Sequence, residues 1–203
     1  MTSRLIKRRK NSSIVKAILV INLILISCSQ KSYVSSDIDH KGLGYELIDQ
    51  FPTSKNGLYH ITYGGNEGFL ERWLRYDVIN EENRKENFIV ELERYVDLDT
   101  IFTPIQKEEL DKQFQNLESI KLDEGKLTNK RLRRTWDKTN LEPSMLDAVS
   151  FPVIQPSKDG TLYAFMYYDW ASFDGHNGSS EIYIFKRVDG KWQEFAKVWV
   201  SIT

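Results

Sequence analysis

Apolar and polar residues alternate along the last third of the chain, as they do in strands that bury one face. Three segments show this pattern: residues 161–168, 181–188 and 192–202. Between the last two, Asp189-Gly190 predicts a two-residue type I′ hairpin turn. Residues 148–154 also favour a strand, although Pro152 suits an edge or a bulge better than a central position. These segments predict an antiparallel meander of three to four strands.

The middle of the chain has the spacing of helices instead. Thr103-Pro104-Ile105-Gln106 predicts a capped helix start, because the Thr103 hydroxyl can accept from the Gln106 amide while the Gln106 side chain closes the box. The helix would extend to about Leu117 and turn four apolar residues inward: Ile105, Leu110, Phe114 and Leu117. Residues 69–78 also favour a helix, whereas residues 88–96 fit both a helix and a strand. We therefore expect an α+β fold in which the meander packs against two to three helices.

The first 28 residues have a different pattern. A basic head comes first, with Arg4, Lys7, Arg8, Arg9 and Lys10. An apolar run over residues 17–26 follows and ends in Ser27 and Cys28. As a helix this run would be about 15 Å long, against roughly 30 Å for the hydrocarbon core of a bilayer, so it is too short to span a membrane comfortably. A basic head, a short apolar run and a small residue together are typical of an export signal.

Leu25-Ile26-Ser27-Cys28 resembles the lipobox of bacterial lipoproteins. The resemblance implies that the chain is cut before Cys28, that its thiol carries a diacylglycerol, and that an acyl chain on the new amine completes a durable membrane anchor. Cys28 is the only cysteine in the 203 residues. In bacterial lipoproteins, an Asp directly after the lipidated cysteine tends to keep the protein in the inner membrane. Because this chain has Ser29 there, it resembles the lipoproteins that reach the outer membrane and face the periplasm. The alternatives are an ordinary signal peptide before a cysteine and an uncut signal anchor.

These boundaries predict a signal peptide over residues 1–27, a lipid anchor and flexible tether over residues 28–41, and a single domain over residues 42–203. The leader holds six basic residues and no acidic ones, so residues 28–203 keep 22 Lys and Arg against 29 Asp and Glu, a net charge of −7. That charge opposes nucleic-acid binding. The closing hairpin around residues 186–192 resembles the last strands of many small exported bacterial proteins, some with cystatin-like or nuclear-transport-factor-like sheets, which implies no activity.

The clearest cluster of candidate ligands lies between two of the predicted strands. Asp169, Asp174, His176 and Glu181 offer carboxylates and an imidazole that could hold Ca²⁺ or Zn²⁺. Their spacing does not match an EF-hand loop, and Asp and Gly in an ordinary turn explain the same composition. The carboxylates could also serve a hydrolase, since two of them suffice for some glycosidases.

Aromatic residues gather in the same region: Tyr167, Tyr168, Trp170, Phe173 and Trp192. Such rings can stack on sugars or hold peptide side chains, but a domain without disulfides also needs them in its core. The chain has neither a Gly-x-Ser-x-Gly elbow nor a Cys-x-x-Cys motif. We therefore expect a non-catalytic protein with no cofactor besides the lipid on Cys28, which binds an envelope protein or glycan. The alternatives are a small-ligand or metal-binding lipoprotein that uses residues 169–181, and a carboxylate-dependent hydrolase.

Overall fold

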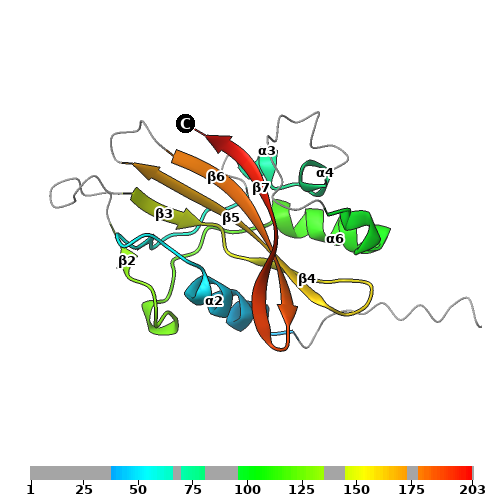
Figure 1. The fold of residues 1–203 in the computed structure, drawn as a ribbon, viewed down its shortest axis with the longest axis horizontal. Helices are drawn as coiled ribbons and strands as arrows, with labels where there is room; N and C mark the ends of the chain where they lie inside the picture. Colours follow the sequence, from blue (N-terminus) through cyan, green and yellow to red (C-terminus); the bar gives the residue numbers. More distant parts are fainter. Residues whose placement is uncertain (1–37, 66–69, 81–95, 135–144, 173–177, 203) are drawn as a thin grey trace, which may run out of the picture. The chain divides into compact units, whose positions relative to one another are not determined.

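Three consecutive antiparallel strands near the C-terminal end of the chain form the largest part of the structure (Figure 1). The computed structural model describes residues 38–65, 70–80, 96–134, 145–172 and 178–202, nearly all of them within the unit Asp39–Thr203. The three strands pair in chain order: β5 (Leu162–Ser172), β6 (Gly178–Val188) and β7 (Lys191–Ile202). Asp189 and Gly190 have positive φ angles of 49° and 75°, as the predicted hairpin turn requires. The predicted meander is confirmed.

Four shorter strands extend this meander into a mixed sheet of seven strands among the described residues. β3 (Met145–Val149) and β4 (Val153–Pro156) both pair antiparallel with β5, so the predicted strand over residues 148–154 is in fact two strands. β1 (Leu58–Tyr59) lies between β2 (Leu132–Arg133) and β3 and runs parallel to both. The fold class is therefore α+β as predicted, with parallel pairs that the alternating pattern did not predict.

β7 is the last strand of the described sheet, and its pairing with β6 is irregular. The register shifts between Ser180 and Glu181, and it shifts again between Ile184 and Phe185. At a bulge of this kind one strand carries an extra residue, bends and twists more strongly. The outer edge of β7 is therefore not a straight row of backbone groups.

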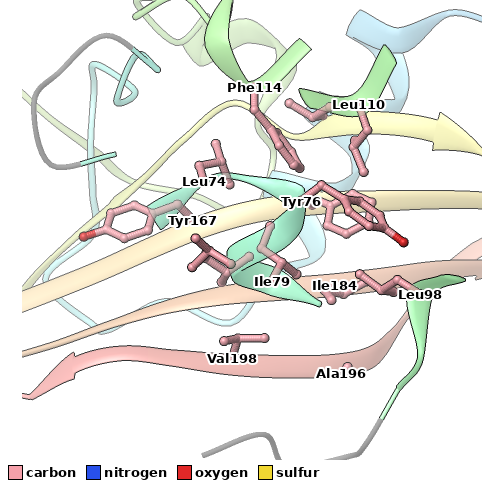
Figure 2. Packing of buried hydrophobic residues seen from close by; sticks show 14 of the residues in the cluster. Leu74, Tyr76, Ile79, Leu98, Leu110, Phe114, Tyr167, Ile184, Ala196 and Val198 are labelled. Carbon is pink, nitrogen blue, oxygen red and sulfur yellow. The ribbon is translucent and has the colours of Figure 1, made fainter. Parts of the chain in front are cut away.

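Helical segments from the middle of the chain cover one face of the sheet: α3 (Leu70–Trp73), α4 (Tyr76–Ile79), the 3₁₀ helix η1 (Leu98–Thr100) and α6 (Pro104–Gln115). Figure 2 shows Leu110 and Phe114 pointing from α6 toward the strands, where Tyr167 and Ile184 belong to the same buried cluster. The helix predicted over residues 69–78 is thus two short helices. Of the ambiguous segment 88–96, only Val96 is described.

The N-terminal helix α2 (His40–Gln50) covers the opposite face. Its buried side chains pack with Ala164 and Met166 of β5, whereas the alternate residues Phe165 and Tyr167 belong to the core under α6. Neighbours along a strand point to opposite faces, so the sheet lies between two apolar cores. The described domain is therefore a three-layer sandwich, with helices on both faces of the sheet and one apolar core on each side.

The start of α2 lies close to the predicted domain boundary. Asp39 caps the helix, because its Oδ1 atom accepts a hydrogen bond of 2.8 Å from the Gly42 amide. The helix therefore begins two residues before the boundary that the sequence predicted, and it includes Gly42 and Gly44. Gly44 is buried, and a side chain there would meet the ring of Phe151.

The start of α6 follows the sequence closely. Thr103 Oγ1 accepts from the Gln106 amide at 3.3 Å, and Gln106 Oε1 accepts from the Thr103 amide at 2.9 Å, which is the predicted capping box. The prediction that Ile105 faces inward is wrong, because its exposed fraction is 73%. Phe114 is nine positions after Ile105 in the helix. At 3.6 residues per turn this is two and a half turns, so the two side chains lie on opposite sides of the helix.

We predict that Leu110→Ala lowers the free energy of unfolding by about 2–5 kcal/mol, because it opens a cavity where Leu110 is fully buried. The matched control is Ile105→Ala on the same helix, which we expect to change stability by less than about 0.5 kcal/mol because Ile105 faces solvent. Urea unfolding followed by circular dichroism measures both. Equal losses in the two variants would contradict the orientation of α6.

Candidate functional site

The structure separates the two described carboxylates of the predicted ligand cluster. Asp169 in β5 accepts hydrogen bonds from the Tyr63 hydroxyl at 3.0 Å and the Ser180 hydroxyl at 2.8 Å. Glu181 in β6 is 5% exposed and accepts from the Ser179 hydroxyl at 3.1 Å. Asp169 is the register partner of Ser180, so Asp169 and Glu181 point to opposite faces of the sheet. These two carboxylates cannot flank one scissile bond or hold one ion together.

The other predicted site residues lie outside the described part of the chain. This applies to Asp174 and His176, and also to Cys28 with its expected lipid. Within the residues that the structure describes, no group of three or more His, Cys, Asp or Glu side chains is placed to hold a metal ion. A ligand site that uses Asp174 and His176 therefore stays a prediction.

The aromatic residues noted in the sequence around the last strands lie mostly in the core. Tyr167 is 2% exposed and Trp192 is 8% exposed, and they belong to the two different cores. The Tyr168 ring packs edge-on against Phe51 with 5.1 Å between ring centroids. Trp170 is partly exposed, and Phe173 lies outside the described residues. Most of these rings therefore hold the sheet between its helices.

A small pocket lies elsewhere, where three segments meet beside β1. Its volume is about 310 Å³. The residues that line it are His60, Lys121, Leu122, Asp123, Glu124, Leu132 and Arg134. Five of these seven side chains are polar or charged, so the pocket is suited to a polar ligand.

The backbone around His60 fixes the walls of this pocket. The His60 amide donates to the Arg133 carbonyl at 3.0 Å, and the His60 carbonyl accepts from the Leu122 amide at 2.8 Å. Two residues further along the chain, the Thr62 amide donates to the Ile120 carbonyl at 2.9 Å. Backbone hydrogen bonds therefore fix the chain around His60 to the segments on both sides of it, and these bonds hold the walls of the pocket in place.

The His60 imidazole is oriented by the same carbonyl. Its Nδ1 atom lies 3.0 Å from the Arg133 oxygen, and a carbonyl can only accept, so Nδ1 carries the proton. This leaves Nε2 with a free lone pair on the other side of the ring. Within the described residues, no group bonds to Nε2. His60 is partly buried, and its side chain lines the pocket.

Four charged side chains of both signs line the same pocket: Lys121, Asp123, Glu124 and Arg134. Asp123 caps the 3₁₀ helix η2 (Glu124–Lys126) by accepting from the Gly125 amide at 3.0 Å. Arg134 and Glu124 form an ion pair of 3.8 Å whose side chains are 77% and 68% exposed. Such a pair contributes little to stability, so a ligand can replace it at small cost. Lys121 has no partner among the described residues.

A buried carboxylate holds the segment that leads into β1. Asp147 in β3 is fully buried, and it accepts from the Tyr168 hydroxyl at 3.0 Å and from the Ser54 amide. Its register partner in β1 is Leu58, two residues before His60. Burial raises the pKa of Asp147 above its ordinary value, and burial lowers the pKa of Lys130 near it. A lone Asp in an apolar strand was a visible signal that the sequence analysis did not use.

No protein family, no curated protein and no solved structure matches the chain. Among the described residues, no helix is long and apolar enough to cross a membrane. The functional interpretation therefore depends on the leader, on the pocket around His60 and on the charge of the domain.

We predict that the stabilising effect of Asp147 depends on pH in the direction opposite to that of an acid whose pKa is lowered on folding. Because the folded pKa is raised above the ordinary value of 3.8, the contribution is greatest below that value and falls as the pH rises through the folded pKa. The difference in unfolding free energy between the wild type and Asp147→Asn should therefore decrease with rising pH, by about 1.4 kcal/mol for each unit of pKa shift. Urea unfolding over a pH series measures it.

Asp159 provides a control of opposite sign. Its hydrogen bond from the Ser157 hydroxyl lowers its pKa to about 2, so its contribution is lost as the pH falls toward that value. The difference between the wild type and Asp159→Asn should increase as the pH rises from about 2 to 4. A difference for Asp147→Asn that is constant, or that follows the same direction as the control, would contradict the buried state of Asp147.

Proposed function

We propose that the chain is an exported lipoprotein whose domain binds an envelope component without catalysing a reaction. The observation that carries this proposal is the position of the only cysteine, Cys28, directly after Leu25-Ile26-Ser27 at the end of a basic and then apolar leader. The leader would direct export and removal of residues 1–27. Ser29 favours the outer membrane, with the domain facing the periplasm.

The distance between the proposed anchor and the domain supports this arrangement. The first helix among the described residues is capped by Asp39, and ten residues lie between Cys28 and this cap. A chain of ten residues reaches at most about 33–36 Å. This length allows the domain to stand clear of the lipid surface while it stays within reach of envelope components.

Two properties of the domain favour binding over catalysis. The carboxylates of Asp147, Asp169 and Glu181 each accept a hydrogen bond from a hydroxyl of the domain itself, so they serve the sheet. The pocket around His60, by contrast, presents charged side chains with weak or no internal partners. The net charge of −7 over residues 28–203 opposes the binding of nucleic acid.

We predict that Cys28→Ala abolishes anchoring. The wild-type protein should lose residues 1–27, gain the mass of a diacylglycerol and an acyl chain, and sediment with membranes, because two or three chains give durable attachment. The variant lacks the thiol that accepts the lipid, so it should gain no acyl mass and stay out of the washed membrane fraction. Intact mass spectrometry and membrane fractionation of the full-length protein measure both effects.

Ser29→Asp is the matched control, because it leaves the thiol in place. It should carry the same lipid mass as the wild type and move from the outer-membrane to the inner-membrane fraction. Processing and localisation of Cys28→Ala that match the wild type would overturn the proposal, and Cys28 would then have no special role.

A further inference from the structure

We propose that the pocket around His60 binds a small zwitterion, namely a free amino acid. This inference rests on the proposed function, since it gives the chemical class of the envelope component that the domain recognises. In this arrangement Lys121 and Arg134 hold the carboxylate of the ligand, while Glu124 and Asp123 hold its ammonium group. All four side chains line the same pocket.

The volume of the pocket limits the ligand to a small molecule. It is about 310 Å³, at the lower end of the range of roughly 300–1,000 Å³ for ligand sites. A water molecule takes about 30 Å³ in the liquid, so the pocket has room for roughly ten waters or a ligand of similar atom count. An amino acid fits this size, whereas a folded partner or a long glycan can place only one end inside.

The charges of the pocket select a ligand that carries both signs. Lys121 and Arg134 balance Asp123 and Glu124, so the pocket has no net charge when His60 is neutral. A simple anion would meet two cations and also two carboxylates, and a simple cation would meet the reverse. A zwitterion can pair with both sets, which is the usual basis of electrostatic specificity. The net charge of −7 over residues 28–203 also repels an anion at a distance but has little effect on a neutral zwitterion.

The remaining groups complete the site. The free Nε2 lone pair of His60 can accept a hydrogen bond from the ammonium group of the ligand. Leu122 and Leu132 supply apolar walls for the carbon skeleton. Since the exposed pair of Arg134 with Glu124 is weak and Lys121 has no partner in the described part of the chain, the ligand replaces few internal contacts.

Isothermal titration of the purified mature lipoprotein in detergent micelles tests the inference. The probes are alanine and leucine in both enantiomers, each beside the matched analogues that lack only the amine or only the α-carboxylate; for leucine these are 4-methylpentanoate and 3-methylbutylamine. We expect saturable binding of at least one amino acid and binding at least tenfold weaker for both of its analogues. No saturable binding by any amino acid, or an analogue that binds as tightly as its parent, would overturn the inference.

Variants assign the binding to this pocket. Lys121→Met and Glu124→Gln each remove one charge of opposite sign, and each should weaken binding of the best amino acid about tenfold. Arg131→Met is the control, because Arg131 is an exposed cation near the pocket that does not line it. Melting curves establish that the variants fold. Unchanged binding in both pocket variants, or an equal loss in Arg131→Met, would place the ligand elsewhere.

The outcome of this test is separate from that of the anchoring test. If Cys28→Ala fractionates like the wild type while an amino acid binds the pocket, the lipoprotein proposal fails and the ligand inference stands. If the wild type is lipidated and no probe binds, the ligand inference fails alone.

Discussion

The burial of strand β5 on both faces is the constraint on which the rest of the fold depends. Along one edge β5 pairs with β3 and β4, and along the other it pairs with β6. Its alternate residues enter two separate cores, one under α6 and one under α2. A central strand of this kind satisfies its backbone in the sheet and buries apolar area on both sides, which compensates for the absence of disulfides. The mixture of apolar and aromatic residues in residues 162–168 follows from this double burial.

The parts of the fold that the sequence predicted well are those set by local chemistry. The capping box at Thr103 and the positive φ angles at Asp189 and Gly190 depend on a few neighbouring residues, so the printed sequence contains the whole signal. Errors arose where apolar character was taken as burial. Ile105 is apolar yet exposed, because the phase of the helix, rather than the residue type, decides which side faces the core.

Long-range pairing was beyond the sequence for a physical reason. β1 pairs in parallel with β2 and β3, although more than 70 residues separate Leu58 from either partner. No local pattern indicates which partner a strand as short as β1 or β2 pairs with. The pocket depends on the same pairings, since His60, Lys121 and Arg134 are distant in the chain and meet only through them. The predicted cluster at residues 169–181 failed for a different reason. Asp169 and Glu181 are close in sequence, but they point to opposite faces of the sheet and so do not meet.

The two bulges between β6 and β7 have a consequence for crowding. Molecules tethered to one membrane meet at a far higher local concentration than molecules in solution, and a long regular edge strand is a template for sheets to join between neighbours. β7 has twelve residues, long enough to act as such a template, but its register breaks twice and lysines at 191 and 197 interrupt its apolar character. With the lipid anchor proposed above, this twisted edge would let many copies share one membrane surface without joining their sheets.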